Sequence, residues 1–139
     1  MNYIPSKNEL IEFEKNFYAA DFLAVEKKAC YFIENGFHDL RIINYLAIAY
    51  AKQKKYYFAE QQFLKLIEYE PYDFDHLFNL ANLYRENEKY DQAINYFINA
   101  LNLRPKSKKT LLVISALYFK KKNFDKAILF LGLLLKDDE

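Results

Sequence analysis

The sequence predicts an all-α solenoid, a single domain in which pairs of antiparallel helices follow one another along the chain. The first observation is a repeat of 34 residues, a period typical of solenoids built from helix pairs. Seven positions carry the same residue type in two consecutive units, and in the earlier unit they are Leu46, Ala47, Tyr50, Tyr56, Ala59, Phe63 and Pro71. The second observation is composition: the 139 residues include only two Gly and three Pro, which favours long helices joined by short turns.

Each unit is expected to contain two helices, because its apolar residues recur three and four positions apart. Pro71 and Pro105 are expected to end the second helix of a unit, since proline lacks an N–H and its ring clashes with the preceding turn. Asp73 or Asp75 can then cap the next helix with a side-chain oxygen, and Ser107 can do the same one unit later. The expected helices span about 40–53, 56–69, 74–87, 90–103, 108–121 and 124–136.

A degenerate unit is expected before residue 40, with helices at about 7–19 and 22–34. Asn35 and Gly36 are typical of a helix end, because glycine accepts the left-handed backbone conformation there. The second of these helices matches the later units at an offset of 34 residues, and the first matches only at 33. Terminal units of a solenoid are commonly atypical, because one side faces water. The single domain of residues 1–139 therefore divides at about 6–39, 40–73, 74–107 and 108–139.

The balance of charge argues against a general attraction to nucleic acid or to an anionic membrane, since 20 basic and 19 acidic residues leave a net charge of +1. Cys30 is the only cysteine, which excludes an internal disulfide framework. No run reaches the roughly 18 apolar residues of a membrane span. Glu9, Glu12 and Glu14 interrupt the region where a secretory signal would be apolar. We therefore expect a cytoplasmic protein without a membrane span.

The repeated residues resemble the pattern of the tetratricopeptide repeat family. The middle unit carries nine positions of this pattern, namely Leu77, Leu80, Ala81, Tyr84, Tyr90, Ala93, Phe97, Ala100 and Pro105. The unit before it differs only at Ile43 and Leu66, and the family's usual Trp and Gly are absent throughout. The resemblance covers 40–136 strongly, as three clear repeats, and 6–39 weakly, as a degenerate one. It implies a right-handed α-α superhelix of helix-turn-helix repeats whose first helices line a concave groove.

The resemblance also implies which residues face that groove and bind a protein or peptide partner. They are Arg41, Asn44, Tyr45, Ile48, Lys52, Phe78, Asn79, Asn82, Arg85, Lys109, Leu112 and Phe119. Amides such as Asn79 and Asn82 can donate to and accept from a peptide backbone of any sequence. Tyr45 and Phe78 would supply apolar anchors. The alternative is that residues such as Phe78 and Leu112 merely pack between neighbouring helices.

These features predict a protein-interaction scaffold, an adaptor that holds a peptide or helix of a partner in the groove and has no catalytic activity. One alternative is a substrate-recruiting domain of a larger enzyme, such as a glycosyl- or sulfotransferase. Another alternative is a self-assembling structural module.

The last expected helix is apolar on nearly every face. Such a helix is normally buried, and the end of a solenoid needs a polar cap. Leu129, Phe130 and Leu133 are therefore expected to lie under a cover, either a second subunit in a homo-oligomer or further repeats. About 12 apolar residues are too few to span a membrane, so self-association or truncation is favoured over a lipid anchor.

The sequence lacks the motifs of common catalytic and cofactor sites, with no Gly-rich phosphate loop, nucleophile elbow or His-rich helix motif. His38 and His76 lie in different units without a second ligand at metal-like spacing, which favours structural or solvent roles. Residues 137–139 are acidic and are expected to form a solvated tail. We therefore expect no cofactor, no bound metal and no nucleic-acid partner.

Overall fold

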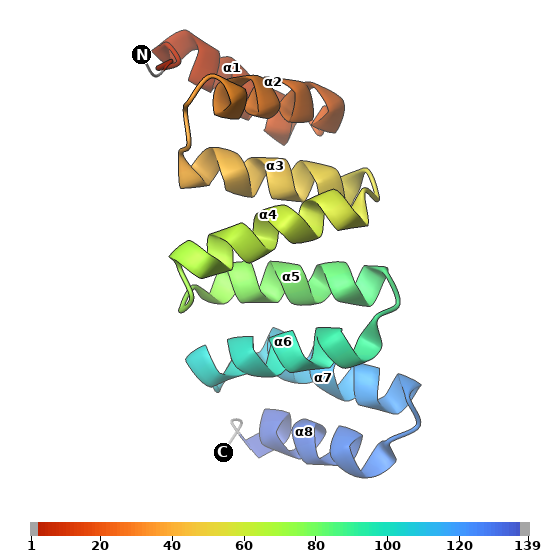
Figure 1. Ribbon diagram of the computed structural model, residues 1–139. Helices are drawn as coiled ribbons and strands as arrows, with labels where there is room; N and C mark the ends of the chain where they lie inside the picture. Colours follow the sequence, from red (N-terminus) through yellow and green to blue (C-terminus); the bar gives the residue numbers. More distant parts are fainter. Residues whose placement is uncertain (1–2, 137–139) are drawn as a thin grey trace. The chain divides into compact units, whose positions relative to one another are not determined.

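The computed structural model describes residues 3–136, and this range is helical without strands. Each helix begins at the residue that the sequence predicts and ends within one residue of the predicted end, so the predicted all-α class is confirmed. The acidic tail expected at 137–139 lies outside the described residues. The helices, labelled in Figure 1, are α1 (Lys7–Tyr18), α2 (Phe22–Glu34), α3 (Leu40–Lys52), α4 (Tyr56–Tyr69), α5 (Phe74–Glu86), α6 (Tyr90–Leu103), α7 (Lys108–Lys120) and α8 (Phe124–Lys136).

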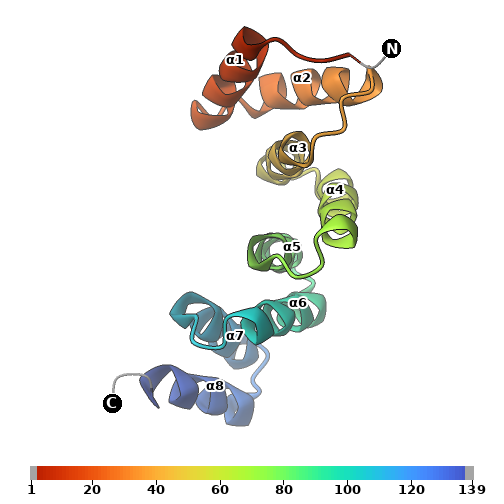
Figure 2. The same ribbon diagram turned by 90° about the vertical axis from the view of Figure 1, so that its left-hand side faces the viewer.

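The chain forms two compact units, the first running to Tyr69 and the second starting at Glu70. In the first unit α1 packs on α2, α2 on α3, and α3 on α4. In the second unit α5 packs on α6, α6 on α7, and α7 on α8, the last pair being visible side by side in Figure 2. Each helix thus contacts mainly its neighbours in sequence, as is typical of repeat proteins.

The turn inside each helix pair places one residue in the left-handed backbone region. These residues follow the 34-residue repeat, and they are Ala20, Lys54, Glu88 and Lys122, with φ between 60° and 62°. In each turn the following N–H donates to a carbonyl five residues earlier, as in the 2.8 Å bond from Lys89 to Tyr84. Such bonds satisfy carbonyls that the helix end leaves open. The sequence did not predict these positive φ angles, because none of the four residues is glycine.

The helix ends expected from the sequence are confirmed. Asp73, rather than Asp75, caps α5 by accepting from the His76 N–H at 3.1 Å. Ser107 caps α7 by accepting from the Thr110 N–H at 3.4 Å. After α2, Gly36 has a φ of 94°, in the left-handed region that favours glycine.

Small side chains occupy the places where the two helices of a pair approach each other. Six of them recur at the two corresponding positions of the clear repeats, and none exposes more than 3% of its surface: Ala47, Ala59, Ala81, Ala93, Ser115 and Ala127. A larger side chain would have to push the helices of a pair apart, because protein interiors are close-packed. The close helix pairing therefore depends on these positions.

Candidate functional site

In the second unit, seven of the predicted binding residues lie on α5 and α7, and we call them the α5/α7 surface. They are Phe78, Asn79, Asn82, Arg85, Lys109, Leu112 and Phe119. Leu112 exposes 54% of its surface and Phe119 exposes 65%. With the exposed Ala116 between them they form one apolar stripe, because positions four and seven apart share a helix face.

Phe78 links α5 to the core of the second unit and to α7. Its ring contacts the rings of Phe74 and Phe97 at centroid distances of 5.5 and 5.2 Å. The Lys109 ammonium of α7 lies 4.5 Å from the centre of the same ring. The interpretation that Phe78 packs between helices is therefore consistent with the structure, whereas Leu112 is too exposed for that role.

Cationic and amide groups accompany the apolar stripe. Lys109 lies in the first turn of α7 and Lys120 at its end, and both are exposed. A hydrogen bond with Tyr90 raises the pKa of Lys120, which keeps this side chain positive. On α5, Asn79 and Asn82 are half-buried, so each keeps part of its surface in contact with solvent. The surface thus offers apolar contacts, hydrogen-bonding amides and positive charge.

In the first unit, two of the predicted groove residues are already engaged by neighbouring residues. The Tyr45 ring contacts Phe13 and Phe17 at centroid distances of 5.5 and 4.6 Å, and burial raises the pKa of its hydroxyl to about 12. The Arg41 guanidinium pairs with Asp39 at 3.0 Å.

The other three predicted groove residues of this unit offer little exposed apolar surface. Asn44 and Ile48 are half-buried and Lys52 is exposed. The Oδ1 atom of Asn44 is buried and has no hydrogen-bond partner among the described residues. The predicted groove residues of the first unit therefore include fewer free apolar anchors than the α5/α7 surface.

A cluster of titratable groups that the sequence analysis missed lies where α5 begins. The Nε2 atom of His76 is 3.0 Å from a Glu70 carboxylate oxygen and 3.8 Å from Asp73 Oδ2. The three possible ligand atoms lie within 4.8 Å of one another, a spacing that a metal ion could bridge. The three-residue spacing of these side chains was the pattern that could have revealed the cluster.

The surroundings of His76 fit a structural role better than metal binding. Its Nδ1 is buried and has no partner among the described residues. A metal on Nε2 would place the proton on Nδ1, where it would be an unsatisfied buried donor, whereas ligating histidines usually donate that proton. With the proton on Nε2, His76 donates to Glu70 and holds the segment before α5 in place.

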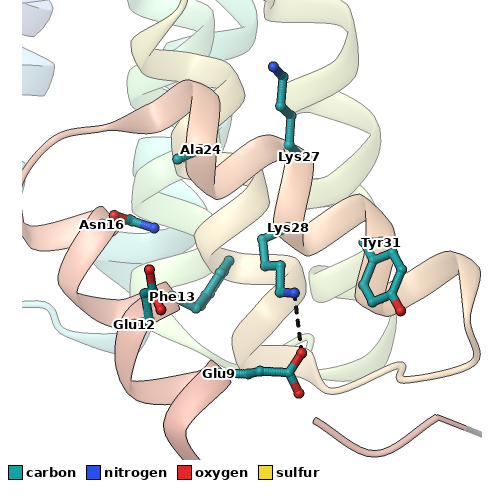
Figure 3. A pocket seen from close by; sticks show the side chains of 8 residues that line it. All are labelled: Glu9, Glu12, Phe13, Asn16, Ala24, Lys27, Lys28 and Tyr31. Carbon is teal, nitrogen blue, oxygen red and sulfur yellow. Dashed lines mark hydrogen bonds and ion pairs between the residues drawn. The ribbon is translucent and has the colours of Figure 1, made fainter. Parts of the chain in front are cut away.

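A pocket of about 530 Å³ lies between α1 and α2 in the first unit. Figure 3 shows Glu9 and Lys28 pointing toward each other at this pocket, where their charged groups are 3.2 Å apart. A hydrogen bond from Tyr3, assisted by the Ser6 N–H and Lys28, lowers the pKa of Glu9 to about 2. The Glu9 carboxylate that borders the pocket is thus already satisfied within the chain.

Glu9→Gln is expected to remove a pH-dependent contribution to the stability of the first unit. Folding lowers the carboxyl pKa from 4.5 to about 2, so the contribution is present above pH 4.5 and is lost as the pH falls toward 2. Urea unfolding curves at several pH values in this window should show the two proteins converging in stability. Glu12→Gln, an exposed carboxyl change on the same helix, is the matched control. A constant gap between wild type and Glu9→Gln would contradict the lowered pKa.

The three residues expected to lie under a cover on α8 do not share one face. Leu129 and Leu133 are exposed, at 59% and 44% of their surfaces. Phe130 instead stacks on the Tyr118 ring of α7, at a centroid distance of 5.6 Å. Phe130 therefore contributes to packing within the second unit.

Comparison with known families agrees with the repeat pattern. Two profiles of the tetratricopeptide repeat match the chain, one over residues 63–95 and the other over 84–139. The chain belongs to the tetratricopeptide repeat family. The matched residues include the whole second unit, and hence the tetratricopeptide repeats that carry the α5/α7 surface.

Solved structures of MamA share the tetratricopeptide repeat fold. The structure titled "Crystal structure of MamA protein" superposes with a TM-score of 0.84 at 15% identity, over 92% of this chain and 70% of that chain. The MamA fragment "41-end" from Desulfovibrio magneticus RS-1 superposes with a TM-score of 0.82 at 14% identity, over 89% of this chain and 70% of that chain. MamA AMB-1 superposes with a TM-score of 0.72 at 22% identity, over 81% of this chain and 62% of that chain. The matched region thus spans less than two thirds of the MamA AMB-1 chain, and identities this low show the fold alone.

Comparison with curated proteins found no matching sequence. Tetratricopeptide repeat proteins are generally non-catalytic scaffolds for protein interaction, and the fold supports this general role. Within residues 3–136, no helix combines the length and the apolar character that crossing a bilayer requires.

Proposed function

We propose that this tetratricopeptide repeat protein is a non-catalytic scaffold that binds a segment of a partner protein on the α5/α7 surface. The observation that carries the proposal is the apolar stripe of α7. Leu112 and Phe119 leave more than half of their surfaces exposed, while Leu111, Ile114 and Leu117 on the same helix are buried. Contiguous exposed apolar groups rimmed by polar ones are a usual mark of a protein interaction site.

The charges around the stripe favour an acidic partner segment. Arg85, Lys109 and Lys120 are all exposed and cationic. Carboxylates of the partner would pair with these groups while its apolar side chains cover Leu112 and Phe119. Asn79 and Asn82 can satisfy peptide groups of the same segment. A short peptide or helix that combines apolar and acidic residues fits this set of contacts, whether the scaffold acts alone or recruits a substrate for a larger enzyme.

The decisive test is selection of peptides on the wild-type protein, followed by binding measurements with variants. Panning a displayed random-peptide library should enrich segments that combine apolar and acidic residues. Fluorescence anisotropy with one enriched peptide should show affinity about tenfold weaker or worse for the double variant Leu112→Asn with Phe119→Asn, because both anchors are lost. Tyr57→Asn removes an equally exposed aromatic from α4 and is the matched control.

A second variant tests the amides. Asn79→Ala with Asn82→Ala should weaken binding of the same peptide while circular dichroism shows unchanged helicity. If both double variants bind the peptide like wild type, the partner site lies elsewhere on the chain.

A further inference from the structure

The outward face of α8 is apolar where the corresponding face of α6 is polar. Leu129 and Leu133 follow Asn95 and Asn99 of α6 by 34 residues. Both asparagines are exposed even though α7 packs on α6. A further helix pair packed on α8 in the way that α7 packs on α6 would therefore leave both leucines in water.

The positions of the first unit that correspond to Leu129 and Leu133 are exposed as well. Lys27 and Tyr31 of α2 are exposed, although α3 packs on α2. Continuation of the repeat therefore does not account for leucine at 129 and 133, and these side chains need a different cover.

Four exposed residues form a stripe along this outward face, and we call them the α8 stripe. They are Asp125, Leu129, Gly132 and Lys136, spaced four, three and four positions apart. This spacing is that of the seam along which two helices pack. Opposite charges lie at the two ends of the stripe, at equal distances from its centre. A stripe of this kind is complementary to itself when a second copy runs in the opposite direction.

Packing among the described residues does not explain the glycine at position 132. A Cβ atom added there would meet no other atom of the described residues 3–136 within 4 Å. Glycine is nevertheless among the least favourable residues in a helix interior. On a packing stripe, the missing side chain would let a second helix come close to the backbone of α8. Gly132 thus marks the point of closest approach of whatever covers the stripe.

We propose that α8 pairs in antiparallel orientation with α8 of a second copy of this chain. A two-fold axis between residues 130 and 131 places Asp125 opposite the partner's Lys136 and Leu129 over the partner's Gly132. Every contact then occurs twice, as in other isologous dimers. Parallel pairing would set the two Asp125 carboxylates side by side, and likewise the two Lys136 ammoniums, so repulsion disfavours it.

The flanking residues extend the apolar contact. Ile128 exposes 66% of its surface, and in the antiparallel pair it lies opposite the partner's Leu133. Burial of these side chains drives association, while the charges at the ends set the direction of the helices. The dimer uses no residue of the α5/α7 surface, so it is independent of the proposed peptide binding.

Sedimentation velocity of the complete chain is the first test, and wild type should form a dimer. Gly132→Leu should loosen self-association by about tenfold or more, because the new side chain blocks the close approach. This variant makes α8 more apolar, so unspecific hydrophobic association would instead become stronger. Leu112→Asn changes an exposed leucine outside the stripe and should leave the dimer intact.

Reversal of the charge at either end of the α8 stripe tests the antiparallel orientation of the two helices. Asp125→Lys and Lys136→Glu should each weaken the homodimer, because each creates like charges that face each other across the interface. An equimolar mixture of these two variants should form a heterodimer, in which both facing pairs are again of opposite charge. Circular dichroism verifies that all variants stay helical. A monomeric wild type, a strengthened Gly132→Leu dimer, or single charge variants that dimerise like wild type would each overturn the proposal.

Discussion

The free energy of unfolding of the first unit is expected to fall by about 3–5 kcal/mol when Phe32 is replaced by alanine. Phe32 is fully buried in α2, and its ring contacts Phe13 at a centroid distance of 5.7 Å and Phe37 at 6.1 Å. The variant loses the free energy gained by burying the ring. It also contains a cavity that the close-packed helices fill only in part.

Urea unfolding followed by circular dichroism measures this loss. Tyr57→Ala is the matched control in the same unit, because Tyr57 exposes 68% of its surface. Its effect should stay within about 0.5 kcal/mol, as for most surface changes. Similar losses for the two variants would contradict the central position of Phe32.

Ala93→Leu is expected to destabilise the second unit by about 1–3 kcal/mol, and Ala93→Arg by at least as much. Ala93 is fully buried in α6, and so is Ala81 in α5, the helix on which α6 packs. Three additional carbon atoms would force the two helices apart or drive the new side chain out of its preferred rotamers.

Thermal and urea unfolding of the second unit test this prediction. Asn95→Leu adds the same side chain two residues away, at an exposed position of the same helix. It should change the stability by no more than about 0.5 kcal/mol. Unfolding curves of Ala93→Leu that match wild type would contradict the close packing of α5 and α6 at Ala93.

The helix positions were predictable because they depend on local chemistry. Pro71 and Pro105 lie just after the ends of α4 and α6, and Asp73 and Ser107 cap the helices that follow. Each of these effects involves residues within a few positions of one another. The small size of residues such as Ala93 likewise follows directly from the repeat, because the two corresponding positions of each clear repeat are filled by small buried side chains.

The binding residues were predictable only as positions on a helix face. Tyr45 was expected as an apolar anchor in the groove, and in the structure its ring contacts two rings of α1. Phe130 was grouped with Leu129 and Leu133, but its ring faces Tyr118. The His76 cluster was missed because Glu70 and Asp73 precede the helix, and only the folded segment brings their carboxylates to the imidazole.

From the residues alone, the 34-residue period, the turn residues and the apolar spacing determined the family, the helices and their order. These properties depend on contacts between residues near in sequence, where each residue type has a strong preference of its own. The tertiary structure alone decided which side chains on each helix remain free, since that depends on neighbours contributed by other helices. It left Leu112, Phe119 and the α8 stripe uncovered, and it placed Tyr45 and Phe130 against aromatic rings of neighbouring helices.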